Sequence, residues 1–260
     1  MAHVVQVEID QALATITLAR PDAGNAMSAQ LIADLALATE QVAADPSVRA
    51  VLLRAEGKNF CVGGDIKAFA TEPDPSDFIE RLAGNLHESL LRLAAIDAPL
   101  VIAVRGAAAG AGISLASAGD IVIGGESSSY SMAYSGIGLT ADGGATWLLP
   151  RLVGLRLAQE MALLNRRLSA EEAVRFGLIT RSVPDEDVEA EALAIAQQIA
   201  AGPTRAFGGI KRLLAAAQTA TLPDHLAAEA KAIGVAMATD DAQGAIRAFL
   251  DRAKPEFHGR

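Results

Sequence analysis

Strand-length apolar runs alternate with helix-length segments through the first part of the chain. The runs AVLLRAEG, PLVIAVRG and DIVIGG begin at Ala50, Pro99 and Asp120, and their nearly continuous apolar character is typical of buried strands. Helical segments, including Asp77–Leu93, lie between them. Such alternation favours an α/β fold in which most strands pair in parallel.

The beginning of the chain has a different pattern. Val4–Asp10 and Ala12–Arg20 alternate apolar and polar residues on either side of Gln11, which predicts a β-hairpin. From Ser28 the spacing of apolar residues becomes helical, and Asp45-Pro46 ends that helix. We therefore expect an antiparallel pair and one helix before the first of the buried strands.

After Pro150 the sequence becomes largely helical. Leu152–Leu164 has helical spacing, and Ser169–Glu172 is a capping box that opens a short helix ended by Gly177. The segment GLITRSVP predicts a brief strand. Further helices are expected at residues 187–201, 204–217, 223–238 and 241–253. We therefore divide the chain into a core domain, residues 1–200, and an all-helical C-terminal region, residues 201–260.

Composition and charge exclude several classes of partner. With a net charge of −9 and no block rich in Lys or Arg, the chain is not expected to bind nucleic acid. Its apolar runs are too short to span a membrane, and the N-terminus does not resemble a signal peptide. The single cysteine, Cys61, cannot form an internal disulfide and is expected to be packed. We therefore expect a cytoplasmic protein without a membrane partner. No His, Cys and Asp cluster has metal-ligand spacing, so no metal site is predicted.

The stretch VRGAAAGAGISLASAGD, from Val104 to Asp120, indicates that something approaches the backbone closely. A dinucleotide loop is disfavoured because Leu115 occupies the third glycine position, and no phosphate-binding G-K-[ST] follows. A nucleophile elbow is disfavoured because Ala116 replaces its last glycine, so Ser114 is expected on a buried helix face. The remaining interpretation is that a helix begins near Gly110, where free amides can receive a ligand carbonyl.

A second loop offers the same features. NFCVGGDIKAF, Asn59–Phe69, follows a predicted strand and places Gly-Gly before a helix start at Asp65. Ligand sites of open α/β sheets form at the carboxyl ends of the strands, where two such loops can converge on one oxygen. The two loops together predict an oxyanion hole.

Four motifs resemble those of one enzyme family. In chain order, FCVGGDI, RGAAAGAGISLASAGDIVI, GIGLTADGGATWLLPRLVG and LSAEEAVRFGLI are similar to segments of the crotonase superfamily, the enoyl-CoA hydratases and isomerases. The resemblance covers nearly the whole chain and implies a spiral core of ββα units with C-terminal helices that build a homotrimer or hexamer. It also implies an acyl-CoA thioester substrate, so coenzyme A enters with the substrate and no separate cofactor is expected. The amides of Gly64 and Ala111 match the two donors that hold the thioester carbonyl.

The resemblance leaves the reaction open, because the acid–base residues differ from those of the hydratases. Ser114 and Tyr134 occupy the positions of the two hydratase glutamates. Asp142 matches the catalytic aspartate of the isomerase branch, which includes the phenylacetate-pathway isomerase. One carboxylate is enough to move a proton between carbons, so double-bond isomerisation of an enoyl-CoA is the favoured expectation. On the sequence alone, Asp142 could instead cap the turn or helix that follows it.

Three other functions stay open at this point. A hydratase would have to position its water with Ser114 or Tyr134. A dehalogenase or hydrolase would use Asp142 as nucleophile and His87 to activate water, as the similarity to chlorobenzoyl-CoA dehalogenase implies, although that enzyme has a Phe at the Gly64 position and a Trp at the Tyr134 position. A non-catalytic CoA-thioester-binding protein would need only the binding residues.

The residues expected to contact substrate are also implied by the resemblance. On the core domain they are Asn25, Ala26, Lys58, Gly64, Asp65, Ile66, Lys67, Ala111 and Tyr134. Phe249 and Lys254 are expected to reach the coenzyme A bound to a neighbouring subunit. The loop Thr71–Phe78 and the helix after it are expected to wall the acyl pocket.

Overall fold

The computed structural model describes residues 3–260 and contains a six-stranded sheet. Its strands lie side by side in the order β1 (Val5–Asp10), β2 (Leu13–Leu18), β3 (Ala50–Ala55), β4 (Leu100–Val104), β6 (Ile121–Gly125) and β9 (Arg181–Val183). β1 pairs antiparallel with β2, and the other neighbouring pairs are parallel. The predicted hairpin and the predicted parallel strands are confirmed.

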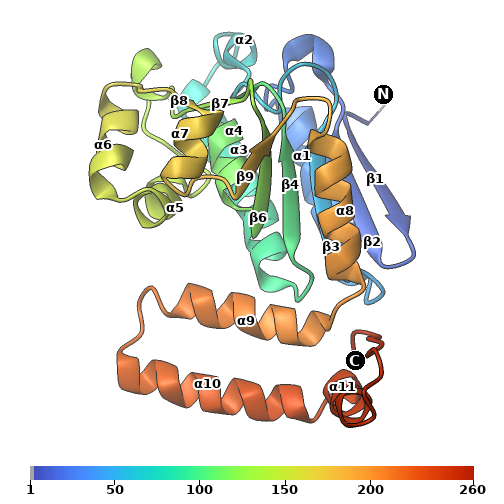
Figure 1. The fold of residues 1–260 in the computed structure, drawn as a ribbon. Helices are drawn as coiled ribbons and strands as arrows, with labels where there is room; N and C mark the ends of the chain where they lie inside the picture. Colours follow the sequence, from blue (N-terminus) through green and yellow to red (C-terminus); the bar gives the residue numbers. More distant parts are fainter. Residues whose placement is uncertain (1–2) are drawn as a thin grey trace.

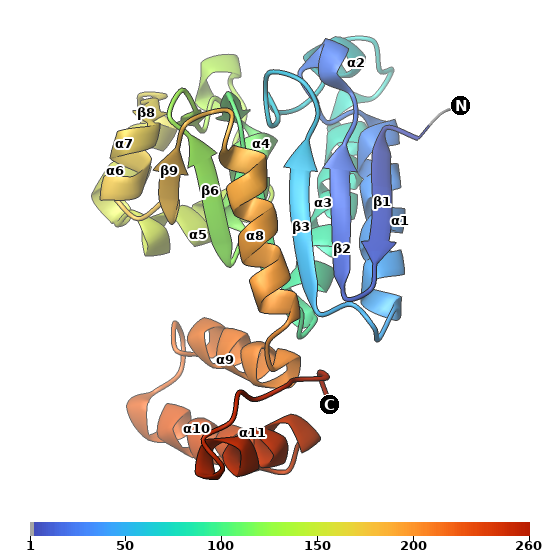
Figure 2. The same ribbon diagram turned by 45° about the vertical axis from the view of Figure 1, so that its right-hand side comes forward.

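Helices cover both faces of this sheet (Figure 1, Figure 2). α1 (Ala29–Ala44) and α3 (Pro75–Ala95) lie on one face, and α8 (Val188–Ala200) lies on the other. Leu52 of β3 joins the core under α8, whereas the residues on either side of it join the core under α1 and α3. Because both faces are covered, the central strands are apolar throughout rather than alternating.

A smaller sheet of three short strands was not predicted. It consists of β5 (Ala107–Ala109), β7 (Ser129–Ser131) and β8 (Leu168–Ser169). These strands are two or three residues long and rich in Ala and Ser, so they carry no alternation that sequence reasoning could detect. α4 (Ala111–Ser117) follows β5 directly, which confirms the predicted helix start beside Gly110.

The short helices show where sequence-based boundaries were correct and where they were not. α7 (Ala170–Arg175) begins with the predicted capping box at Ser169. The helix predicted over Leu152–Leu164 is confirmed as α6 (Leu155–Leu163), but its predicted start is wrong, because Leu152 is the last residue of a separate helix, α5 (Ala145–Leu152), that was not predicted. Gly154 separates them with a φ of 81°, a conformation in which a helix cannot continue.

The remaining short elements lie close to the two predicted loops. α2 (Ile66–Phe69) follows the first loop, and single 3₁₀ turns lie at η1 (Pro21–Ala23) and η2 (Ser135–Ile137). α3 begins at Pro75 rather than at Asp77, because the Asp74 carboxylate caps its first turn and proline fits there without losing a hydrogen bond.

The predicted all-helical C-terminal region is confirmed as a separate layer beyond one end of the sheet (Figure 1). It comprises α9 (Thr204–Ala216), α10 (Leu222–Met237) and α11 (Asp240–Leu250). Lys211 connects this layer to the core, since its Nζ lies 2.9 Å from the carboxylate of Asp120. No helix within residues 3–260 has the length and apolar character required to cross a bilayer.

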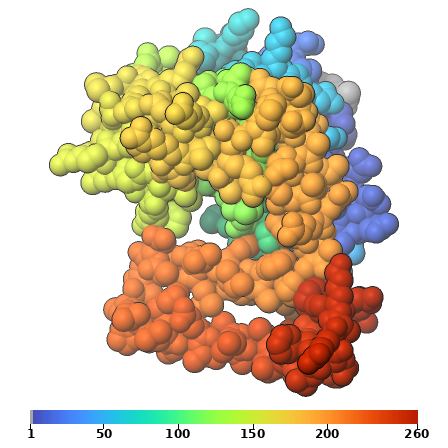
Figure 3. Space-filling model, in the orientation of Figure 1, coloured from blue at the N-terminus to red at the C-terminus, as the bar shows by residue number. Residues whose placement is uncertain are grey.

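Large apolar side chains are exposed on this layer. A groove of about 1070 Å³ runs between α9 and α10, and Figure 3 shows hollows along α9. The exposed large residues are Ile210, Leu214, Leu222, Leu226, Ile233, Val235, Met237, Ile246, Phe249 and Leu250. Exposed apolar residues in such numbers are typical of an interaction surface.

Candidate active site

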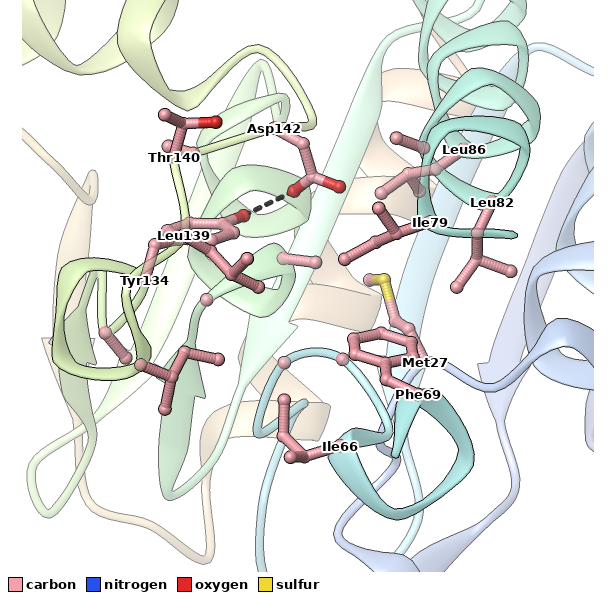
Figure 4. Close-up of a pocket in the computed structure, with 18 of the residues that line it drawn as sticks. Met27, Ile66, Phe69, Ile79, Leu82, Leu86, Tyr134, Leu139, Thr140 and Asp142 are labelled. Atoms are coloured by element: carbon pink, nitrogen blue, oxygen red, sulfur yellow. Dashed lines mark hydrogen bonds between the residues drawn. The ribbon is translucent and has the colours of Figure 1, made fainter. Parts of the chain in front are cut away.

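A cavity of about 350 Å³ lies between α3 and the chain that follows β7 (Figure 4). Its lining is mostly apolar, and both glycine-rich loops contribute to it: the first with residues that include Gly63 and Gly64, the second with Gly110 and Ala111. Figure 4 shows Asp142 and Tyr134 on one side, with Ile79, Leu82 and Leu86 facing them from α3. The cavity therefore combines an apolar wall with a small number of polar groups, as small-molecule sites commonly do.

The two predicted loops are brought together by backbone pairing. The Ala109 N–H donates to the Cys61 carbonyl at 2.9 Å, and the Cys61 N–H donates to the Ala107 carbonyl at 3.1 Å. A side chain on Gly112 would place its Cβ 2.2 Å from the Cys61 oxygen, so only glycine allows α4 to lie this close. Gly110 adopts a φ of 53° and a ψ of −128°, a conformation that is open to glycine. The small residues of the sequence are therefore required by the crossing of the two loops.

The crossing leaves two backbone donors beside the cavity. Within residues 3–260, neither the Gly64 N–H nor the Ala111 N–H donates to another protein group. Ala111 is the first residue of α4, where helix amides lack an internal partner. A Cβ on Gly64 would lie 2.7 Å from the Phe69 ring, so a larger residue would require that ring to shift. Two such amides on one cavity can stabilise negative charge on a ligand oxygen.

The Asp142 carboxylate is held by a tyrosine. Tyr134 donates its hydroxyl hydrogen to Asp142 Oδ1 at 2.6 Å. Burial raises the pKa of Tyr134, and the negative charge of Asp142 raises it further, so the phenol keeps its proton. α5 begins after Gly144 without a side-chain cap. Asp142 therefore does not act as the helix cap that its sequence context allowed.

Ser114 lies behind this pair and not in the cavity lining. Its side chain is 0% exposed, its Oγ donates to the Asp142 carbonyl at 2.9 Å, and it lies 3.0 Å from the Tyr134 hydroxyl. A Cβ on Gly143 would lie 2.6 Å from the Ser114 Cβ, so the space around the serine is filled. The prediction of a buried helix serine is confirmed. There is no room at this position for the glutamate of a hydratase.

His87 is engaged with the backbone next to Asp142. Its Nε2 accepts the Gly143 N–H at 3.0 Å. In the neutral ring the proton then sits on Nδ1, so neither nitrogen has a lone pair left to accept a proton from water. His87 is also absent from the cavity lining. This geometry disfavours the hydrolytic alternative, in which His87 activates a water molecule.

The loop at Asn25 is held rigidly, and its side chain is not available to a ligand. Asn25 is fully buried; its Oδ1 accepts the Arg20 N–H at 2.8 Å, and its Nδ2 donates to the carbonyls of Glu56 and Asn59 at 2.9 and 2.8 Å. Ala26 is buried as well. Any contact of this loop with a ligand has to use backbone atoms.

Asp65 has a structural role in addition to its predicted position beside coenzyme A. Its carboxylate caps α2 through the Ala68 N–H and lies 2.8 Å from the Arg20 guanidinium. Although burial opposes its ionisation, the hydrogen bonds from Arg20 and Ala68 hold the pKa of Asp65 below its usual value. The Asp65 carboxylate therefore fixes the start of α2 in its ionised form.

The other predicted coenzyme A residues fall into two groups. Lys58, Ile66 and Lys67 are exposed around α2, and Ile66 also lines the cavity. Phe249 and Lys254 lie at the opposite end of the molecule, on and after α11 (Figure 1, Figure 2). A single chain therefore does not bring these two groups together.

The acyl wall differs in part from the expectation. None of the residues of the loop Thr71–Phe78 lines the cavity, whereas the helix after it supplies Ile79, Leu82, Ala83 and Leu86. This spacing of three and four residues is the signal of one helix face, and it was present in the sequence. Sequence reasoning missed Phe69 and Met27, because their positions follow from the path of the chain rather than from a local pattern.

Comparisons with known proteins agree with this geometry. Residues 8–260 match the sequence profile of the enoyl-CoA hydratase/isomerase family. The chain is 39% identical over 259 residues to a Rhodobacter capsulatus protein named "Probable enoyl-CoA hydratase", which covers 99% of each chain. It is 36% identical over 262 residues to the 1,2-epoxyphenylacetyl-CoA isomerase of Escherichia coli, which covers 100% of each. A crystal structure from Mycobacterium abscessus, named as an enoyl-CoA hydratase/isomerase, superposes with a TM-score of 0.95 at 37% identity and covers 98% of this chain and 100% of that one.

Proposed function

The chain belongs to the enoyl-CoA hydratase/isomerase family, and we propose that it shifts a double bond within an enoyl-CoA with Asp142 as the acid–base residue. The observation that carries the proposal is the position of Asp142. Its carboxylate lines the same cavity as Gly64 and Ala111, whose amides have no other partner within residues 3–260. A base and an oxyanion hole on one apolar cavity are the groups that this reaction needs.

The reaction proceeds through an enolate of the thioester. The Asp142 carboxylate removes a proton from C2 of a 3-enoyl-CoA, and the electrons of the C2–H bond move towards the thioester oxygen. The Gly64 and Ala111 amides stabilise the negative charge on that oxygen more strongly than they stabilise the neutral carbonyl. The protonated Asp142 then returns the proton to C4, which leaves the double bond between C2 and C3.

Hydration is disfavoured by the groups around Asp142. A hydratase of this family positions water with two glutamates, and those positions hold the buried Ser114 and the hydrogen-bonded Tyr134. Glu80 also borders the cavity, but its side chain is exposed on the first turns of α3. A carboxylate exposed to solvent is a poor group for holding one ordered water.

Coenzyme A is proposed to lie along the surface beside α2. Lys58 and Lys67 supply positive charge for its phosphates, and Ile66 contacts the pantetheine as it enters the cavity. The buried Asn25–Ala26 loop contributes backbone atoms alone. Phe249 and Lys254 of a neighbouring subunit complete the site.

The neighbouring subunit follows from a proposed homotrimer or hexamer built by the C-terminal layer. The exposed apolar side chains and the groove between α9 and α10 support this assembly, because burying them removes a large apolar surface from water. We also propose a cytoplasmic location, supported by the single buried Cys61, whose pKa burial raises to about 12.

The proposal is tested by a single-turnover reaction of the purified protein with a 3-enoyl-CoA in deuterated water. Conversion to the 2-enoyl-CoA is expected in the wild type and is expected to fall by at least about 100-fold in Asp142→Asn, because the amide cannot accept the proton. The control is Asp10→Asn, which removes an exposed charge at the hairpin, at the opposite end of the sheet. Hydration of crotonyl-CoA without isomerisation of the 3-enoyl-CoA would contradict the proposal.

A further inference from the structure

We propose that Tyr134 is a positioning residue for Asp142: its hydroxyl occupies one carboxylate oxygen and leaves the other as the single oxygen that takes the proton and returns it. This inference rests on the proposed isomerase function. It assigns to Tyr134 a task in the reaction rather than the contact with substrate expected from its place in the chain.

The first contact is the hydrogen bond from Tyr134 to Asp142. At 2.6 Å it has the short length of a hydrogen bond from a hydroxyl to a charged oxygen. Figure 4 shows it beside the cavity, with the Tyr134 ring and the Asp142 carboxylate both among the lining residues. Because the phenol is a donor here, Asp142 Oδ1 has a partner before any substrate binds.

The second contact packs Ser114 against the phenol. Ser114 Oγ lies 3.0 Å from the Tyr134 hydroxyl and is fully buried in α4, and both hydroxyls direct their hydrogen at Asp142. α4 is the helix that begins with Ala111, so the same short element carries an oxyanion amide and the support of the tyrosine. The distance from the thioester oxygen site to the base is therefore set by one rigid helix.

The backbone of Asp142 is held on both sides. Ser114 binds its carbonyl oxygen at 2.9 Å, and His87 Nε2 accepts the next N–H, that of Gly143, at 3.0 Å. These two bonds come from α4 and α3, the two helices that flank the cavity. With its backbone fixed, Asp142 retains rotation of its own side chain, and the Tyr134 hydrogen bond is what restrains that rotation.

With Asp142 Oδ1 bound to Tyr134, only Oδ2 is free to take the proton from the substrate. The proton taken from C2 is bound to Asp142 Oδ2 and has to be delivered from that atom to C4. Both transfers then occur on the same face of the substrate. Because Tyr134 occupies Oδ1, the proton has one position fewer from which it can exchange with water.

The test uses a 3-enoyl-CoA that carries deuterium at C2, in ordinary water. We expect Tyr134→Phe to lower kcat by ~10- to 100-fold with an unchanged KM, since the ring still fills its space while the base loses its orientation. The share of product that carries deuterium at C4 is also expected to fall, because both Asp142 oxygens then bind the proton and exchange it with water. A residue that only maintained the fold would not change this share among the turnovers that occur.

The matched control is Tyr130→Phe. Tyr130 is the other tyrosine of the chain, and it does not line the cavity. It is fully buried, and its hydroxyl accepts a hydrogen bond from Ser128 at 3.0 Å. This variant loses a comparable buried hydroxyl and is expected to keep wild-type kcat and deuterium retention. Equal losses in the two variants would overturn the inference, because the effect would then come from stability.

Two further outcomes separate this inference from the proposed function. Wild-type kcat and deuterium retention in Tyr134→Phe, together with a collapse in Asp142→Asn, would overturn the positioning role and leave the isomerase intact. If the wild type does not isomerise the substrate, the proposed function fails, and crystal structures of the wild type and Tyr134→Phe decide the inference. An Asp142 carboxylate that keeps its orientation without the hydroxyl would overturn it, and a rotated carboxylate would support it.

Discussion

The loops around the cavity and the C-terminal helices place their side chains in opposite ways. Around the cavity, small residues bring backbone segments into contact, and the polar groups of Ser114 and Asn25 are buried and paired within the chain. On the C-terminal layer, large apolar residues such as Ile233 and Phe249 are exposed. The polar groups of the first region are paired within their own chain, whereas the second region leaves large apolar side chains exposed. Substitutions around the cavity should therefore destabilise the fold, whereas substitutions on the C-terminal layer should weaken subunit association.

The largest effect is expected from Gly112→Ala in the cavity region. The added Cβ would lie 2.2 Å from the Cys61 oxygen, and backbone on both sides prevents its relief. We expect a loss of about 3 kcal/mol in the free energy of unfolding, measured by urea denaturation. Gly244→Ala on α11 is the matched control, because its Cβ meets nothing within 4 Å. Equal free energies of unfolding for the two variants would show that the cavity region is no more sensitive to an added side chain than the C-terminal layer.

The next effect concerns assembly. Ile233→Asp places a charge on the exposed face of α10 and is expected to weaken subunit association by about 2 kcal/mol per chain, since it removes a large apolar side chain from the interface. Analytical ultracentrifugation over a range of concentrations measures it. The thermal unfolding of the core should change little. Leu37→Asp, at another exposed position, on α1, is the control, and identical behaviour of the two variants would show that the C-terminal layer is not the interface.

A smaller effect is expected where the start of the chain joins the core. The buried Asp34 carboxylate accepts the Val4 N–H at 2.8 Å and a hydrogen bond from Gln30 at 2.7 Å. Burial alone would raise the pKa of Asp34, but these hydrogen bonds and His3 hold it below its usual value. Because the pKa of Asp34 is lower in the folded state, the ionised carboxylate stabilises the fold at pH values above the pKa of the unfolded state. This stabilisation is lost as the pH falls through the pKa of the folded state.

Asp34→Asn is therefore expected to lose about 1 kcal/mol at pH 7 and progressively less as the pH is lowered beneath 3.8. Thermal unfolding at pH 7 and at pH 3 measures the difference. Asp10→Asn, at an exposed position, should show no such dependence. A deficit of the same size at both pH values would contradict an origin in the charged carboxylate.

The smallest effect is a gain. Gly84 lies inside α3 on its exposed side, where a Cβ meets nothing within 4 Å. Gly84→Ala is expected to raise the free energy of unfolding by about 0.5–1 kcal/mol, because alanine loses less backbone entropy in a helix. Chemical denaturation detects it. A loss instead of a gain would mean that this face of α3 is covered in the assembled protein.

Sequence reasoning predicted the fold best where the spacing of apolar residues within one segment was regular over several residues. The hairpin, the buried parallel strands and the C-terminal helices are all confirmed, because their apolar spacing is repeated over many residues. The small sheet and α5 were missed. α5 contains Pro150 and begins immediately after Gly144, residues that are typical of a turn when nothing is known of the packing around them.

At the site, sequence reasoning found the loops but not their supports. The glycines at 64 and 110 signalled close approach, and the structure brings both to one cavity. The hydrogen bonds among Ser114, Tyr134 and Asp142 join residues from three segments, and their geometry depends on how β7, α4 and the loop before α5 pack. No local pattern specifies such contacts. The proposed contact of Phe249 and Lys254 with coenzyme A involves a second copy of the chain, which one sequence does not describe.

The crossing of the two glycine loops divides the cavity into a part that can be altered and a part that cannot. At the carbonyl end, a residue larger than glycine at 112 meets the backbone of Cys61, and one at 64 meets the ring of Phe69. The opposite wall is one face of α3, where Ile79, Leu82, Ala83 and Leu86 line the cavity with side chains rather than with backbone. Redesign of this enzyme for a new acyl group, by selection or in the laboratory, can therefore be confined to a library at four positions of a single helix.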